Sequence, residues 1–114
     1  MSDEIRVIEA GGNWVVRTGG AVIAESRRAC EIRLPGRPPQ VVMPREDVAM
    51  SLFEPRDDFL ACPLRGRARY LDLHTSARVI EKAAWIWEEP ARPELAEMVG
   101  FDPERLNIEQ LSTI

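Results

Sequence analysis

Three consecutive ionisable side chains, those of Arg45, Glu46 and Asp47, directly follow Pro44. A proline that precedes acidic residues is typical of the first turn of a helix, where carboxylates interact favourably with the free N–H groups. In a functional interpretation, Arg45 holds an anion while Glu46 or Asp47 acts as a base or a metal ligand. In a structural interpretation, the two acids only cap the helix, and the common use of acidic caps favours this second interpretation.

A second segment, Cys62-Pro63-Leu64-Arg65-Gly66, places an arginine close to a cysteine. A nearby positive charge lowers the pKa of a thiol, so Cys62 could act as a nucleophile or a redox sensor. The chain holds one histidine, His74, and a Cys–His pair would therefore have to form across the fold. Free cysteines are among the most buried residue types, which favours an inert Cys62. Gly66 is expected at a backbone position that does not tolerate a side chain.

A third segment places Tyr70, Asp72 and His74 two residues apart. On a strand such residues share one face, so a phenol, a carboxylate and an imidazole would lie in a row, as a proton relay requires. An ordinary exposed polar face explains the same pattern and is favoured. The indoles of Trp14, Trp85 and Trp87 could line a pocket for a flat ligand, although burial in a small core explains them equally well.

Metal and cofactor motifs are few. The sequence contains no Walker-type glycine-rich loop, no Rossmann glycine fingerprint and no HExxH motif. A structural zinc site requires four Cys or His ligands, whereas the chain holds Cys30, Cys62 and His74. We therefore predict no metal site, and the sequence leaves any cofactor unknown.

The elements that must position these residues are mostly strands. Short segments rich in β-branched residues, several of them alternating, predict strands over residues 5–8, 14–17, 21–24, 29–34, 41–43, 67–74 and 105–109. Gly11-Gly12-Asn13 predicts a hairpin between the first two strands. Residues 79–87 fit both a strand and a helical turn. Two short helices are predicted over residues 44–53 and 93–98, the second ending at Gly100.

The composition describes one soluble domain over residues 1–114. Of these residues 45% are hydrophobic and 30% charged, and no segment approaches the roughly 18 consecutive apolar residues of a membrane helix. The start of the chain, Met1-Ser2-Asp3-Glu4, lacks the basic and apolar regions of a signal peptide. We therefore expect a cytoplasmic protein with no membrane partner and with free thiols at both cysteines.

The net charge of −4 conceals an asymmetry along the chain. Residues 27–69 hold nine arginines and six acids, whereas residues 88–109 hold seven acids and two arginines. Because arginine forms bidentate contacts with carboxylates and phosphates, the positive segment could bind a small anion. A GC-rich genome that encodes arginine in place of lysine is the simpler explanation. A nucleic-acid partner is not expected, since the pI is about 5.1.

The order of the segments resembles the domain of unknown function 427 family. The pattern is Pro-Arg-Glu-Asp-Val, then Cys-Pro-x-basic-Gly-x-Ala-x-Tyr, then Ala-Ala-Trp with a proline soon after. The matching residues are Pro44, Arg45, Glu46, Asp47, Val48, Cys62, Pro63, Arg65, Gly66, Ala68, Tyr70, Ala83, Ala84, Trp85 and Pro90. The resemblance extends from about Arg6 to Glu109.

This resemblance implies a small, mostly bacterial protein of mainly β, antiparallel structure, similar to the β-tent group. The family also carries a nucleotidyltransferase-like label. Two positions depart from its pattern: the family often has lysine at the position of Arg65 and histidine at that of Ala61. The absence of that histidine weakens any metal or Cys–His chemistry here.

Three functions remain open at this point. The first is binding of a small anionic ligand in a pocket formed by the motif segments. Its candidate residues are Arg45, Glu46, Asp47, Cys62, Arg65, Tyr70, Asp72, His74 and Trp85. The second is a metal-dependent nucleotidyltransferase in which Glu46, Asp47 and Asp72 share a metal ion. The third is a protein-interaction module that uses sheet edges or the acidic segment 88–109. The sequence does not give the oligomeric state.

Overall fold

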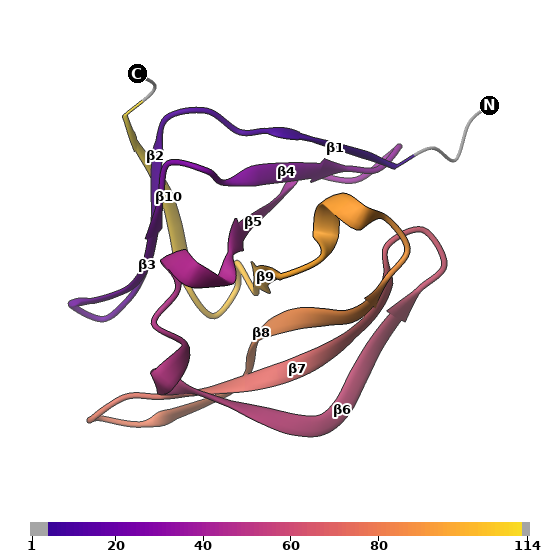
Figure 1. Cartoon of the computed structure of the whole chain (residues 1–114). Coiled ribbons are helices and arrows are strands. Elements are labelled where there is room, and N and C mark those ends of the chain that lie inside the picture. Colours follow the sequence, from indigo (N-terminus) through magenta and orange to yellow (C-terminus); the bar gives the residue numbers. More distant parts are fainter. Residues whose placement is uncertain (1–4, 113–114) are drawn as a thin grey trace.

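Two antiparallel sheets make up the fold, which the computed structural model describes over residues 5–112 (Figure 1). The larger sheet has the strand order β1-β4-β5-β9-β8-β7-β6, and the smaller one the order β10-β2-β3. The mainly β, antiparallel prediction is confirmed. The strands are β1 (Arg6–Glu9), β2 (Asn13–Thr18), β3 (Ala21–Ser26), β4 (Cys30–Arg33), β5 (Gln40–Pro44), β6 (Phe53–Cys62), β7 (Gly66–His74), β8 (Val79–Pro90), β9 (Met98–Phe101) and β10 (Asn107–Ser112).

Residues 1–4 and 113–114, which include the acidic start of the chain used for the localisation prediction, lie outside the described residues. Over residues 5–112, no helix is long and apolar enough to cross a bilayer. Both cysteines are free thiols.

The predicted hairpin around Gly11 and Gly12 is wrong. The first strand pairs with β4, where Val7 lies opposite Ile32, whereas β2 pairs with β3 and β10. Both glycines have positive φ angles, and they turn the chain from the larger sheet into the smaller one. The local flexibility of two glycines therefore marks a turn correctly, but burial of apolar side chains decides which strand is the partner.

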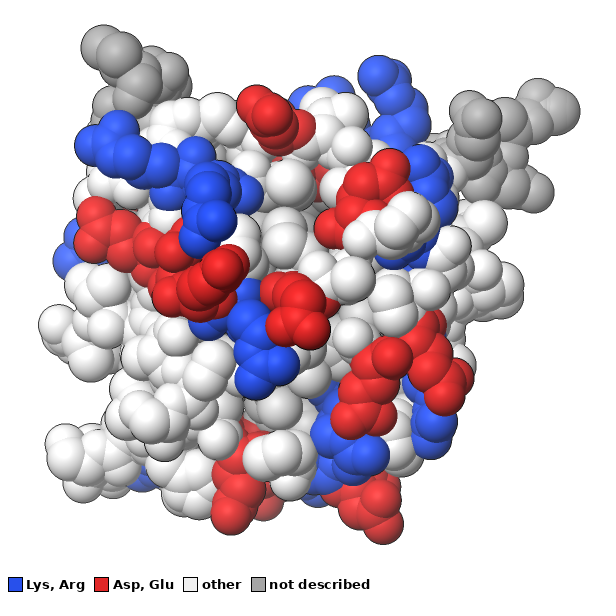
Figure 2. All heavy atoms as spheres, in the orientation of Figure 1, with Lys and Arg blue, Asp and Glu red and all other residues white. Residues whose placement is uncertain are grey.

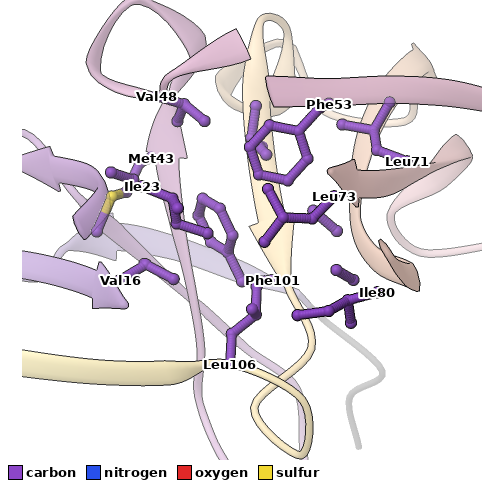
Figure 3. Packing of buried hydrophobic residues seen from close by; sticks show 14 of the residues in the cluster. Val16, Ile23, Met43, Val48, Phe53, Leu71, Leu73, Ile80, Phe101 and Leu106 are labelled. Atoms are coloured by element: carbon purple, nitrogen blue, oxygen red, sulfur yellow. The ribbon is translucent and has the colours of Figure 1, made fainter. Parts of the chain in front are cut away.

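The main core lies between the two sheets. Figure 3 shows Ile23 of the smaller sheet beside Phe101 and Leu73 of the larger one. A second cluster joins Ile32 of β4 to Ala68 of β7 through Leu95, so the larger sheet curves around it. Figure 1 shows this curvature. The short turn that carries Leu95 lies between β4 on one side and β8 on the other.

The two predicted helices are wrong. Their residues form single 3-10 turns instead: η1 (Arg45–Asp47), η2 (Met50–Leu52) and η3 (Pro93–Leu95). After η1, Val48 is extended and bridges Ala24 of β3, which ends the turn. After η3, Ala96 is extended and Glu97 has a φ of +65°, which leads the chain directly into β9. Local propensity thus predicted helices at residues whose chain becomes extended after a single turn.

The ambiguous residues 79–87 belong to strand β8. Its pairing with β7 shifts register between Leu71 and Leu73, so β8 carries extra residues there. One of them, Lys82, has a φ of +55°. Downstream of this bulge, Trp85 lies opposite both Tyr70 of β7 and Gly100 of β9.

We predict that Gly100→Ala destabilises the fold by about 1–3 kcal/mol, the usual cost of overpacking a core. An alanine Cβ at this position would lie 2.2 Å from Trp85 Nε1. Gly20→Ala is the matched control, because nothing lies within 4 Å of a Cβ there. Urea denaturation measures both free energies of unfolding, and equal values for the two variants would contradict this account of Gly100.

Candidate functional site

The first motif segment attaches η1 to the end of β3. Ser26 Oγ donates to Asp47 Oδ2 at 2.6 Å, and Arg28 Nη2 donates to Asp47 Oδ1 at 3.1 Å. Burial alone would raise the pKa of the Asp47 carboxyl, but these two hydrogen bonds and the charge of Arg28 hold it below its usual value. Glu46 is exposed and contacts the same Arg28. The two acids therefore bind a neighbouring strand end rather than cap their own turn.

The second motif segment forms the turn between β6 and β7. Gly66 has a φ of +104°, and a Cβ there would lie 2.2 Å from the carbonyl oxygen of Glu89, so the predicted need for glycine is confirmed. Arg65 Nε donates to Cys62 Sγ at 3.3 Å, and Arg65 Nη1 donates to Gln40 Oε1 at 2.8 Å. The Arg65 guanidinium thus links this turn to the start of β5.

The two cysteines have different surroundings, and the pKa of the Cys62 thiol is lowered. Partial burial alone would raise its pKa, but the hydrogen bonds from Arg65 and from the Leu64 backbone, together with the Arg65 charge, lower the pKa below its usual value. Cys30 differs, because burial and the carboxylate of Glu9 raise the pKa of its thiol. The two cysteines have similar exposure, but the pKa is lowered at Cys62 and raised at Cys30.

In the third motif segment, Asp72 and His74 each contact a charged residue of another segment. Asp72 accepts hydrogen bonds from Arg56 Nη1 at 3.0 Å and from the backbone N–H of Lys82 at 3.0 Å. Burial would raise the pKa of Asp72, but these bonds and the Arg56 charge lower it. His74 Nε2 lies 3.2 Å from a carboxylate oxygen of Glu54. Asp72 therefore secures the β8 bulge at Lys82, and His74 has a separate partner.

Two aromatic residues of the motifs pack together. The rings of Tyr70 and Trp85 meet edge to face, with 6.1 Å between their centroids. Trp85 is 8% exposed and lies against Gly100, and its Nε1 is buried without a hydrogen-bond partner. Trp85 is therefore a core residue of the larger sheet.

A pocket of about 390 Å³ opens beside the turn that holds Arg65. It lies between the proline-rich loop after β4, the start of β2, and the β9–β10 connection. Its lining residues are Trp14, Arg37, Pro38, Pro39, Gln40, Val41, Arg65, Phe101, Pro103 and Ile108. We call it the Arg37–Arg65 pocket. A smaller hollow of about 300 Å³ shares Arg37 and is lined by Cys62.

A second concavity, of about 550 Å³, lies on the face of β7 and β8 that carries Leu71 and Ile86. We call it the β7–β8 groove. Its charged residues form two ion pairs, Arg45 with Glu97 and Arg69 with Glu88. The remaining lining residues are Met50, Pro55 and Trp87, with Leu71 and Ile86. Figure 2 shows that most basic side chains on the face in view lie in contact with acidic ones.

The nine candidate residues therefore fall in different places. Cys62 and Arg65 meet beside the Arg37–Arg65 pocket, whereas Arg45 lines the β7–β8 groove. Glu46 and Asp47 contact Arg28, Asp72 contacts Arg56, and His74 contacts Glu54. Tyr70 and Trp85 lie in or against the core.

Sequence reasoning did not single out Arg37, Arg69 or Glu97 as lining residues. The lining residues come from segments far apart in the chain, and no spacing rule connects them. The local signals of the first pocket were a proline-rich loop that carries an arginine and the indole of Trp14.

A family model described as "Domain of unknown function (DUF427)", with the short name NTP_transf_9, matches residues 6–111. The chain belongs to this family. A search among curated proteins found no match. In this DUF427 protein, motif residues that carried the resemblance make contacts within the fold. Asp47 accepts a hydrogen bond from Ser26 of β3, Gly66 pairs with Pro90 of β8, and Trp85 packs against Gly100.

The carboxylates of the nucleotidyltransferase hypothesis are engaged separately, Asp47 by Arg28 and Asp72 by Arg56. In the part of the DUF427 chain that the structure describes, no group of three or more His, Cys, Asp or Glu side chains is placed to hold a metal ion.

We predict that Asp47→Asn lowers the free energy of unfolding at pH 7 by about 1–3 kcal/mol, because hydrogen bonds to a charged group are lost. The folded-state pKa of Asp47 is depressed. Its contribution is therefore present above the unfolded pKa of about 3.9 and is lost as pH falls through the folded pKa. The deficit of the variant should narrow over that range. Glu104→Gln, an exposed substitution, is the control, and a deficit independent of pH would contradict the assignment.

We also predict that iodoacetamide modifies Cys62 faster than Cys30 at pH 7.5, on the order of tenfold, because the thiolate is the nucleophile. Arg65→Gln should remove most of this difference, whereas Arg78→Gln, an exposed arginine elsewhere, should leave it unchanged. Peptide mass spectrometry over time gives both rates. Equal rates in the unmodified chain would rule out the activated thiol.

Proposed function

We propose that this DUF427 protein binds a small organic anion in the Arg37–Arg65 pocket. The observation that carries the proposal is electrostatic. Among the described residues no carboxylate lies within 4.0 Å of either guanidinium, although many other arginines of the chain are paired with acids, as Arg28 is with Asp47. Two positive charges that share a pocket without an acid in its lining favour an anionic ligand.

The Arg65 guanidinium is positioned and still has donors to offer. It donates one N–H to Cys62 Sγ and one to Gln40 Oε1, and neither acceptor is a carboxylate. A guanidinium has five N–H donors in a planar fork, so three remain for a ligand. This fork fits a carboxylate or a phosphate in bidentate geometry, which supports these two groups as the anionic part of the ligand.

The other walls of the pocket suit an apolar or flat body. Trp14, Val41 and Ile108 contribute apolar surface, and the indole N–H of Trp14 donates to the Gly11 carbonyl at 2.7 Å. That bond fixes the orientation of the Trp14 ring. The volume of about 390 Å³ falls in the range of small-molecule sites, roughly 300–1,000 Å³.

The β7–β8 groove is the weaker candidate for an anion. It also holds two arginines, but Glu97 and Glu88 already neutralise them. To bind either arginine, an anion would have to replace its paired glutamate, which remains close because it belongs to the same chain. Of the nine candidates, the proposal therefore rests on Arg65, with Cys62 next to it, and adds Arg37 and Trp14.

The β-tent-like architecture, the bacterial origin and the cytoplasmic location belong to the same proposal. Two antiparallel sheets that share one core cluster support the first, the family resemblance supports the second, and two free cysteines support the third.

Thermal-shift measurements test the binding proposal. The panel is inorganic phosphate, adenosine monophosphate, glucose 6-phosphate, citrate, benzoate and indole-3-acetate, each at millimolar concentration. At least one anion with an apolar or aromatic body should raise the Tm, because a ligand that binds only the folded state must stabilise it. Arg37→Gln and Arg65→Gln should each remove this rise.

Arg78→Gln is the matched control, since Arg78 is also exposed, has no carboxylate within 4.0 Å among the described residues and lies outside this pocket. The proposal fails if no anion of the panel raises the Tm. It also fails if the Arg37 and Arg65 variants respond as the unmodified chain does.

A further inference from the structure

The turn before β9 places a glutamate where glycine is normally found. Ala96 has φ −62° and ψ 133°, and Glu97 follows with φ +65°. This combination is that of a type II turn, whose third residue needs a positive φ and is usually glycine or asparagine. A glutamate in this conformation carries a backbone cost that glycine would avoid.

The contacts of the Glu97 side chain do not compensate this backbone cost. The Glu97 carboxylate meets Arg45 Nη1 at 3.4 Å, with side chains that are 72% and 48% exposed. Exposed ion pairs of this kind contribute little to stability. The backbone carbonyl of Glu97 accepts a hydrogen bond from the N–H of Arg45, but any residue offers that carbonyl. The side chain itself is therefore the unexplained feature.

Lys82, the other described non-glycine residue with positive φ, shows the contrast. Its backbone N–H donates to Asp72 Oδ1 at 3.0 Å, and Asp72 in turn accepts a hydrogen bond from Arg56. The strain at Lys82 is thus compensated by a hydrogen-bonded bulge. The strain at Glu97 occurs instead at the rim of the β7–β8 groove.

A second ion pair of the groove has closer contacts than that of Arg45 and Glu97. Arg69 Nε donates to Glu88 at 2.6 Å, and Arg69 Nη1 donates to the carbonyl oxygen of Arg56 at 2.8 Å. Met50 and Ile86 add partly buried apolar side chains to the lining. The groove therefore presents a close ion pair, a more distant and more exposed ion pair, and the apolar side chains of Met50 and Ile86.

We propose that the β7–β8 groove binds a small zwitterion with an apolar side group, that is, a free α-amino acid or a short peptide. The ligand ammonium binds Glu97, the ligand carboxylate binds Arg45, and the apolar group packs on Met50 and Ile86, which line the groove and are only partly buried. A ligand with a single charge would leave either Arg45 or Glu97 without a partner. A zwitterion replaces their weak mutual contact with two contacts and keeps the groove neutral. The proposal is independent of anion binding in the Arg37–Arg65 pocket.

Titrations followed by ¹H–¹⁵N NMR test this proposal on the full chain. The ligands are L-leucine, L-phenylalanine and L-leucyl-L-leucine, compared with N-acetyl-L-leucine and L-leucinamide, which each lack one charge. At least one zwitterion should bind and shift the amide signals of Arg45 and Glu97 and the indole N–H signal of Trp87. Blocking either charge should weaken its binding at least tenfold. Preference for leucine or for the dipeptide then identifies an amino acid or a peptide as the ligand.

Arg45→Gln and Glu97→Gln should each weaken zwitterion binding at least tenfold. Glu31→Gln, which breaks an ion pair with Arg33 elsewhere on the surface, and Arg37→Gln should not. Glu97→Gly should abolish binding while the Tm stays equal or rises, which separates a binding role from a structural one. The proposal is overturned if no zwitterion binds at 10 mM to the folded chain, or if the two blocked leucines bind as tightly as leucine.

Discussion

Strand β9 is the constraint on which the larger sheet depends. It pairs with β5 on one side and with β8 on the other, so it joins the arm β1-β4-β5 to the arm β8-β7-β6. All four of its residues are buried, and Gly100 lies opposite both Val42 and Trp85. Because Gly100 has no side chain, the Trp85 indole can cover the strand and close the second core cluster. Both concavities border β9: Phe101 at its end lines the Arg37–Arg65 pocket, and Glu97 just before it lines the β7–β8 groove.

Folding removes most of the charge asymmetry seen along the sequence. Arginines of the positive segment pair with acids of the negative one, as Arg45 does with Glu97 and Arg69 with Glu88. Others pair within the first part of the chain, as Arg28 does with Asp47. Arg37 and Arg65 remain without a carboxylate partner among residues 5–112. The positive charge counted along the segment therefore points to two particular guanidiniums, those of Arg37 and Arg65. Their position indicates where an anion would bind.

Most strands were predictable because alternating burial leaves a direct trace in the sequence, as in Cys30 to Leu34, but β6 and β9 were not among the predicted strands. The need for glycine at Gly66 was also predictable from its place in a turn. The absence of helices was not predictable. The backbone conformations of Val48 and Glu97 depend on contacts with residues far away in the sequence, and local helix propensity does not account for such contacts. The site was the least predictable part. Cys62 and Arg65 could be paired from their spacing, but Arg37 and Trp14 reach the same pocket only through the topology of the two sheets.

An NMR titration of the unmodified chain with indole-3-acetate tests the central claim most directly, because it reports on individual side chains. Binding in the Arg37–Arg65 pocket predicts saturable shifts of the Arg65 Nε–H and Trp14 indole N–H signals, with the Arg69 Nε–H and Trp87 indole N–H signals unchanged. Shifts confined to Arg69 and Trp87, or no saturable shift at either pair, would contradict the account.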